Sequence, residues 1–140
     1  MRILKNLVIP ILLIGLFTIA CQFTPQRNND TLTNSEWQLV YIRKSVPIQG
    51  SSITMKFLDG EVSGNAGCNS YFGSYEIEGN SIIFSQLAMT EMACMEPDGI
   101  MEQEQAYLAF LSEVVSFSID GNQLLLKKEV QDQLTFEKAN

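Results

Sequence analysis

The feature that most constrains the fold is a series of short β-type runs joined by two-residue turn signals. The turn pairs Asp59-Gly60, Gly79-Asn80 and Gly121-Asn122 each lie between runs in which apolar and polar residues alternate. Such pairs between alternating runs are typical of β-hairpins. The runs that we expect to form strands are 36–42, 53–57, 61–63, 71–77, 81–84, 114–119, 123–128 and 133–138. Seven or eight short strands with tight turns predict a mainly β fold, an antiparallel barrel-like or strongly curved sheet.

Two features of these segments can be placed more closely. The first run puts Trp37, Leu39 and Tyr41 on one face, and we expect Trp37 to be part of the core. The segment 98–113 breaks the strand pattern, because its apolar residues recur at helical spacing: Met101, Leu108, Leu111 and, just beyond it, Val115. With Asp98 as the expected N-cap, the segment predicts one helix of about four turns packed on the sheet.

The first 20 residues have the composition of an export signal. Arg2 and Lys5 precede an uncharged, mostly apolar run that ends near Ala20. This run is shorter than the roughly 20 residues of a membrane-spanning helix, and a basic start before a short apolar run is typical of a secretory signal peptide.

The residues Thr18-Ile19-Ala20-Cys21 resemble a bacterial lipobox, in which the cysteine receives lipid and becomes the first mature residue. The sequence thus divides into a lipoprotein signal peptide (1–20), a lipidated Cys21 with a flexible tether (21–34) and a folded domain (35–140). Gln22 after the cysteine favours the outer membrane, facing the periplasm, if the source is Gram-negative. The alternative is an ordinary secreted protein that is cleaved nearby and keeps Cys21 as a free thiol.

The charge and the histidine content exclude several classes of function. The chain has 9 Lys and Arg against 16 Asp and Glu, a net charge of −7, and no histidine. An acidic surface repels phosphate backbones, so nucleic acid is not an expected partner. Without histidine there is no Ser-His-Asp or Cys-His catalytic arrangement and no His-containing zinc site. We expect no catalytic residue, no metal and no cofactor.

Two cysteines other than Cys21 are present, Cys68 and Cys94. In an exported chain they are expected to pair in a structural disulfide. A redox-active pair would have the Cys-x-x-Cys spacing, which is absent.

Several motifs, taken in order, resemble the META domain of HslJ-like heat-shock proteins over residues 35–138. The motifs are Trp37-Gln38-Leu39, Gly67-Cys68-Asn69-Ser70-Tyr71-Phe72-Gly73-Ser74-Tyr75, Thr90-Glu91-Met92-Ala93-Cys94 and Gly121-Asn122-Gln123-Leu124. The resemblance implies a small β-rich domain with a helix, often on an envelope lipoprotein, tied to stress response and without an established catalytic activity.

The leading hypothesis is a non-enzymatic, lipid-anchored module of the cell envelope that binds a partner or supports envelope integrity. Its partners would be the membrane, through the anchor, and an envelope protein, peptide or glycan. Strand alternation puts Tyr71 and Tyr75 on one face and Phe72 on the other. If Phe72 is core, the two tyrosines could line the binding surface.

Two alternatives remain open. Met89, Met92 and Met95 offer thioethers at a regular spacing, and soft sulfur ligands select Cu(I). The carboxylates Glu91, Glu96, Asp98, Glu102 and Glu104 could instead serve a hydrolase that acts on an envelope polymer. The simpler explanation of the methionines is that they fill gaps between the helix and the sheet. The simpler explanation of the carboxylates is a solvated acidic face around a helix N-terminus.

Overall fold

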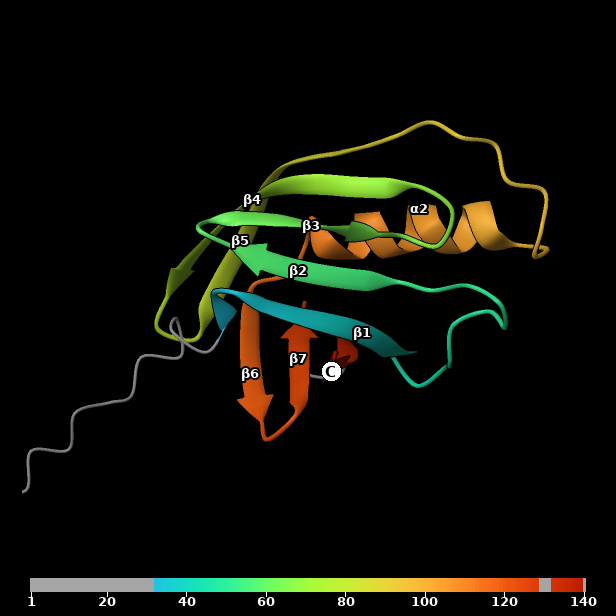
Figure 1. The fold of residues 1–140 in the computed structure, drawn as a ribbon. Coiled ribbons are helices and arrows are strands. Elements are labelled where there is room, and N and C mark those ends of the chain that lie inside the picture. Colours follow the sequence, from blue (N-terminus) through green and yellow to red (C-terminus); the bar gives the residue numbers. More distant parts are fainter. Residues whose placement is uncertain (1–31, 129–131, 140) are drawn as a thin grey trace, which may run out of the picture.

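The computed structural model describes residues 32–128 and 132–139, and Figure 1 shows their arrangement. The elements are β1 (Ser35–Ile42), β2 (Thr54–Leu58), β3 (Glu61–Asn65), β4 (Ser70–Glu78), β5 (Ser81–Met89), α2 (Ile100–Leu111), β6 (Ser116–Asp120), β7 (Gln123–Lys127) and β8 (Gln133–Lys138). The predicted signal peptide, Cys21 and most of the predicted tether lie outside the described residues.

The strands form a closed antiparallel barrel in chain order, in which β8 pairs with β1. This confirms the predicted fold class, a mainly β barrel with one helix. The three predicted hairpin turns are also confirmed, and Gly60, Gly79 and Gly121 have φ of 86°, 61° and 58°, the left-handed region that glycine enters at little cost. Consecutive strands pair over several residues except β5 and β6, whose paired register in the described chain is Ser81 with Ser116.

The barrel interior is filled by side chains. Trp37 is 1% exposed, as predicted, and its indole N–H donates to Ser35 Oγ at 2.7 Å. Tyr41, predicted to share the face of Trp37, is instead 45% exposed. The pairing of β1 with β8 shifts register between Leu39 and Tyr41, and such a bulge turns the following side chain to the other face.

The predicted helix is present as α2, which begins later than expected. Its N-cap is Gly99, with φ 79° and no side-chain capping bond, so the predicted Asp98 cap is wrong. The left-handed backbone at this position favours glycine over a capping aspartate. The chain leaves the helix after Leu111, and Val115 is 55% exposed rather than on the buried helix face. No helix in residues 32–128 and 132–139 is long and apolar enough to cross a membrane.

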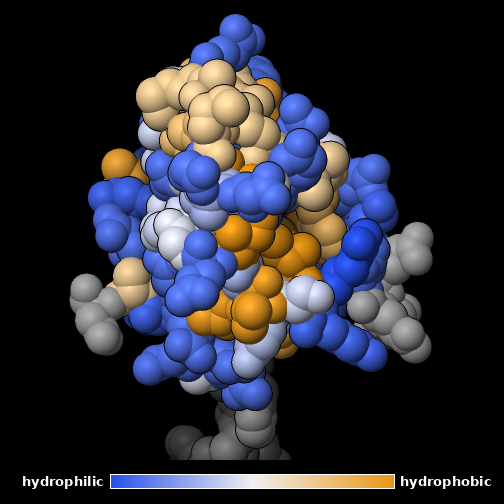
Figure 2. Space-filling view, turned by 90° about the vertical axis from the view of Figure 1, so that its right-hand side faces the viewer, coloured by the Kyte–Doolittle hydropathy of each residue, from blue (hydrophilic) through white to orange (hydrophobic). Residues whose placement is uncertain are grey.

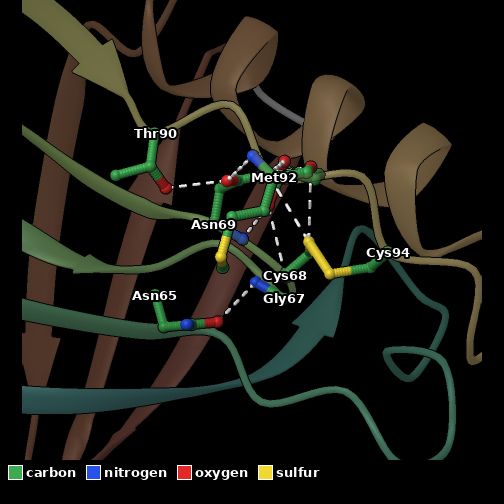
Figure 3. Close-up of a disulfide and its surroundings, with 8 residues drawn as sticks. Asn65, Gly67, Cys68, Asn69, Thr90, Met92 and Cys94 are labelled. Atoms are coloured by element: carbon green, nitrogen blue, oxygen red, sulfur yellow. Dashed lines mark hydrogen bonds between the residues drawn. A yellow bond between two sulfur atoms is a disulfide. The ribbon is translucent and has the colours of Figure 1, made fainter.

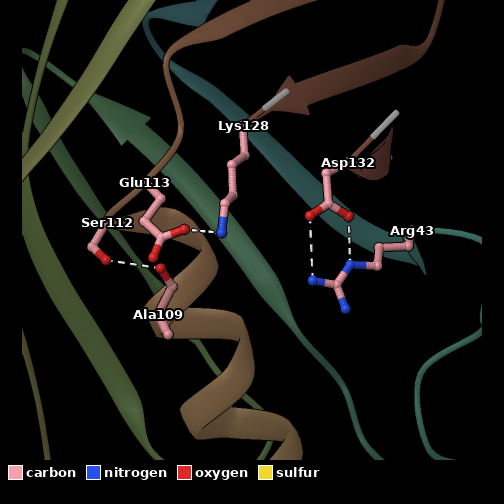
Figure 4. A network of polar contacts seen from close by, with 6 residues as sticks. All are labelled: Arg43, Ala109, Ser112, Glu113, Lys128 and Asp132. Atoms are coloured by element: carbon pink, nitrogen blue, oxygen red, sulfur yellow. Dashed lines mark hydrogen bonds and ion pairs between the residues drawn. The ribbon is translucent and has the colours of Figure 1, made fainter. Parts of the chain in front are cut away.

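Two ion pairs join the ends of different secondary-structure elements (Figure 4). The Arg43 guanidinium, just after β1, donates to both carboxylate oxygens of Asp132, just before β8, at 2.5 and 3.3 Å. Glu113, after α2, pairs with Lys128, after β7. Exposed ion pairs of this kind contribute about 0–1 kcal/mol each, so the barrel depends on its core rather than on them.

The folded part begins at least three residues before the predicted start at Ser35. Leu32 is fully buried in the core, and the backbone N–H of Asn34 donates to the carbonyl of Phe57 at 2.9 Å. The end of the predicted tether is therefore part of the domain.

Candidate functional site

A buried asparagine organises the site at the turn between β3 and β4. Asn69 is 0% exposed. Its Nδ2 donates to the Met92 carbonyl at 3.1 Å, and its Oδ1 accepts from the Met92 backbone N–H at 2.7 Å (Figure 3). The same Oδ1 accepts from Thr90 Oγ1 at 2.7 Å. The Asn69 side chain thus makes the hydrogen bonds that a neighbouring strand would otherwise make to the segment after β5.

Glu104 of α2 completes this arrangement from the helix side. Its carboxylate, 0% exposed, accepts from the backbone N–H groups of Cys68 at 3.2 Å and Asn69 at 2.6 Å, and from Asn69 Nδ2 at 2.8 Å. We call Asn69, Thr90, Met92 and Glu104 the Asn69 clamp. Three donors on one carboxylate satisfy it without a cation.

The burial of Glu104 contradicts its predicted place on a solvated acidic face. The buried residues of α2 include Ile100, Glu104, Tyr107 and Leu111, which lie three or four positions apart on one helix face. The sequence contains the signal for this burial. Glu104 shares the i, i+4, i+7 and i+11 spacing of the apolar face, so it is expected to point toward the core.

The disulfide between Cys68 and Cys94 is present, as predicted, with 6.1 Å between the Cα atoms. It ties the segment after β5 to the turn that carries Asn69. Figure 3 shows the disulfide beside the Asn69 clamp. The disulfide and the clamp both join the turn between β3 and β4 to the segment after β5. Together they restrict the motion of that segment at two points.

The predicted tyrosine binding surface is wrong. Tyr71 and Tyr75 are 1% and 8% exposed, whereas Phe72 is 57% exposed. Tyr75 packs edge-on against Phe57 at 5.0 Å between ring centroids. The alternation along β4 was predicted correctly, but the face that lies inward is the tyrosine face.

The buried tyrosine hydroxyls have partners inside the barrel, which is why this face can be buried. The Tyr71 hydroxyl donates to the Thr54 carbonyl at 3.0 Å, and the Tyr107 hydroxyl lies 2.9 Å from Tyr71 Oη. Burial raises the pKa of Tyr71 and of Tyr107 above the ordinary value. Both side chains therefore remain neutral donors in the core.

The methionines predicted as copper ligands occupy different surroundings. Met89 ends β5 and packs against the core, whereas Met92 is 56% and Met95 85% exposed. Cys94, the other soft ligand in this segment, is bonded to Cys68. Within the described chain, no group of three or more Cys, Asp, Glu or His side chains is placed to hold a metal ion.

The remaining acidic residues of the predicted cluster lie at the surface. Glu91, Glu96, Asp98 and Glu102 are all exposed, as the prediction of a solvated face required. None of them takes part in an ion pair within residues 32–128 and 132–139.

Two loops meet beside the N-terminus of α2. The Ile48 backbone N–H donates to Gln103 Oε1 at 2.6 Å, and Gln103 Nε2 donates to Ser51 Oγ at 3.0 Å. A Cβ placed on Gly99 would lie 3.3 Å from Ile48 Cδ1, which shows how closely the loop after β1 approaches the start of α2.

Apolar side chains of these loops are exposed. The loop after β1 presents Val46, 71% exposed, and the half-buried Ile48, and the loop before α2 presents Met92 and Met95. We call these four residues the loop face. Figure 2 views this side of the molecule and shows apolar surface with hydrophilic side chains between and around it. The disulfide and the Asn69 clamp hold the part of this surface that carries Met92, and Gln103 holds the loop that carries Ile48.

Comparison with known proteins agrees with this architecture. The family model described as META domain matches residues 30–140. No curated protein matches the chain. Among solved structures, the NMR structure of a protein from Burkholderia xenovorans is 28% identical and has a TM-score of 0.66, with coverage of 81% of this chain and 87% of that one.

Two further solved structures share the fold. Another NMR structure is 22% identical, with a TM-score of 0.63 and coverage of 77% of this chain and 92% of that one. The crystal structure of a DUF4847 family protein from Bacteroides vulgatus is 14% identical, with a TM-score of 0.54 and coverage of 80% and 96%.

Proposed function

The chain belongs to the META-domain family, and from that membership we propose that it is a non-enzymatic, lipid-anchored binding module of the cell envelope. In this role it would hold another envelope component and support envelope integrity under stress. Its partner would be an envelope protein, peptide or glycan, and its link to the membrane would be lipid on Cys21.

The observation that carries this proposal is the use of the buried carboxylate in the Asn69 clamp. Glu104 accepts three hydrogen bonds from Cys68 and Asn69 and is closed to solvent. A general acid or base must reach the proton that it transfers. Glu104 instead fixes Asn69, and Asn69 holds the backbone of Met92 in the loop that carries the exposed methionines. An ordered exposed apolar surface is typical of a binding site.

The disulfide supports a place outside the cytoplasm. Structural disulfides persist in oxidising compartments, and the periplasm and the cell surface are such compartments. The lipobox resemblance at Cys21 agrees with export, and a lipid with more than one acyl chain anchors a protein stably where a single chain is marginal.

The experiment that tests the anchor compares the wild type with Cys21→Ser in a bacterial host fed labelled palmitate. We expect label and membrane association in the wild type, and loss of the label with release from the membrane or blocked signal removal in the variant. A normally cleaved Cys21→Ser protein that still fractionates with membranes would contradict the anchor.

The non-enzymatic part of the proposal is tested separately. Purified wild-type protein is incubated with peptidoglycan and with the envelope polysaccharides of the host, and soluble products are measured. We expect no turnover. Turnover that disappears in Glu102→Gln or Glu91→Gln would show a carboxylate-based hydrolase instead.

A further inference from the structure

We propose that the loop face binds a cationic, amphipathic segment of a partner protein. This inference rests on the proposed binding function and names the chemical class of the partner. Three properties of the described residues support it: apolar exposure, rigidity and charge.

The exposed apolar side chains of the loop face include two flexible methionines. Met92 and Met95 are 56% and 85% exposed, and Val46 is 71% exposed. Methionine side chains are unbranched and polarisable, so they adapt to apolar partners of different shape. Figure 2 shows further apolar surface on this side of the molecule. A partner would therefore present an apolar stripe of its own.

The backbone beneath these side chains is held on both sides. The Met92 N–H and carbonyl are bonded to Asn69, and the neighbouring Cys94 is bonded to Cys68. Gln103 holds the other loop through the backbone of Ile48. A surface that is already ordered loses less conformational entropy on binding, so a moderate contact area is sufficient for affinity.

The negative charge around the loop face favours a positively charged partner. The exposed carboxylates Glu91, Glu96, Asp98 and Glu102 belong to the loop and helix start that carry the methionines. Arg43 and Lys44 lie shortly before Val46, and Arg43 is paired with Asp132, so the four carboxylates outnumber the nearby cations. Complementary potentials favour a partner that carries lysine or arginine beside its apolar residues.

The same charge argues against two other occupants. A second copy of the chain has a net charge of −7 and presents the same acidic loop, so two copies would repel each other here. An anionic lipid surface would also be repelled. A basic protein segment is the occupant that gains from both the apolar and the acidic part of this surface.

The test uses the full chain in nanodiscs of zwitterionic lipid, with empty discs as the blank. The probes are two fluorescent 16-residue peptides that have leucine at the same helix-spaced positions, one with lysine and one with glutamate at the others. We expect the lysine peptide to bind at least about tenfold more tightly, a difference of about 1.4 kcal/mol, and to weaken as salt is raised.

The loop face is tested with Val46→Ser combined with Met95→Ser. These side chains are exposed, so the variant should keep the wild-type melting temperature while the lysine peptide binds about tenfold more weakly. Ile83→Ser is the matched control, because Ile83 is also exposed (61%) but lies near the start of β5, and it should leave binding unchanged.

Three results would overturn the proposal. They are equal binding of both peptides, equal loss in the Ile83 control, and binding of the chain to anionic vesicles that depends on Val46 and Met95. The last result would assign the loop face to a lipid surface. Each is distinct from a failure of the anchor, which is read from Cys21→Ser alone.

Discussion

The side-chain amide of Asn69 hydrogen-bonds both backbone groups of Met92, donating to its carbonyl at 3.1 Å and accepting from its N–H at 2.7 Å. A partner residue in an antiparallel sheet makes the same pair of bonds through its own C=O and N–H groups. Asparagine is suited to this task because its side chain has a donor and an acceptor at one end. Aspartate lacks the donor.

The substitution Asn69→Asp is therefore expected to cost about 2–4 kcal/mol of unfolding free energy. It removes the donor to Met92 and places a carboxylate beside that of Glu104, where Asn69 Nδ2 now donates at 2.8 Å. Urea denaturation measures the loss. The control is Asn122→Asp in the exposed β6–β7 turn, which we expect to change stability by less than about 0.5 kcal/mol. Equal small losses at both positions would show that the clamp contributes little.

Glu104→Gln tests the same network from the helix. Both carboxylate oxygens of Glu104 accept hydrogen bonds. A glutamine would place its amide N–H₂ where one of these oxygens lies, so the donor that faces this group would lose its acceptor. We expect a loss of about 1–3 kcal/mol, as for a buried group left unsatisfied. Glu102→Gln, two residues earlier and exposed, makes the same chemical change and should cost little. A Glu104→Gln protein as stable as Glu102→Gln would contradict the structural role.

The local features of the fold could be predicted from the sequence, because short-range signals determine them. The Gly79-Asn80 and Gly121-Asn122 hairpins and the burial of Trp37 follow from turn chemistry and alternation within a few residues. The pairing of Cys68 with Cys94 followed from the predicted export and from the number of cysteines. These predictions needed no knowledge of how distant segments meet.

The parts that were missed depend on distant contacts. Glu104 joins Asn69 across 35 positions, and Tyr71 joins Tyr107 across 36, so nothing near either residue indicated its partner. The inward face of β4 was assigned wrongly because tyrosine and phenylalanine both suit a core, and the hydroxyl partners decide between them. The Asp98 cap failed because the backbone conformation of Gly99, rather than a side chain, starts α2.

The buried tyrosine pair predicts loss of stability in alkali. Burial raises the pKa of Tyr71 and Tyr107 in the folded state, so the folded protein holds these protons more tightly than the unfolded chain does. Their contribution is complete below the unfolded pKa of about 10 and is lost as pH rises above it. Tyrosinate absorbance should show both groups ionising only with unfolding.

The hydroxyls of Tyr71 and Tyr107 are expected to contribute differently to the free energy of unfolding. Tyr71→Phe leaves both the Thr54 carbonyl and the Tyr107 hydroxyl without this partner, whereas Tyr107→Phe leaves Tyr71 bonded to Thr54. We expect about 1–3 kcal/mol for Tyr71→Phe and roughly 1 kcal/mol for Tyr107→Phe. Thermal or urea unfolding of the two variants measures the order. The reverse order would mean that the Thr54 carbonyl gains little from Tyr71.

Trp37→Ala is expected to cost about 3–5 kcal/mol, as large-to-small changes in a packed core do. Trp37 is 1% exposed on β1, and its removal also frees Ser35 Oγ from the indole N–H. Val46→Ala, at an exposed apolar position, is the control and should stay within about 0.5 kcal/mol. A loss below 1 kcal/mol for Trp37→Ala would place that side chain outside the stabilising core.

Reduction of the disulfide between Cys68 and Cys94 tests how much the bond contributes to the stability of the barrel. Its 26-residue separation corresponds to roughly 3.5 kcal/mol in the chain-entropy model, and we expect reduction to lower stability by about 2–4 kcal/mol. The barrel should survive reduction, because its strands pair independently of the bond. Circular dichroism of the reduced protein should therefore keep its β signature while the urea midpoint falls.

Mass spectrometry without reductant, on protein taken from the envelope, should find Cys68 linked to Cys94. Replacing both with alanine should be tolerated better than replacing one, since a single remaining thiol can pair between molecules. The Asn69 clamp still holds Met92 in the double variant, so the loop face should loosen rather than detach, with faster amide exchange from Ala93 to Glu96 than at Met92. Two free thiols in protein from an oxidising envelope would contradict the structural disulfide and return Cys94 to the set of possible soft metal ligands.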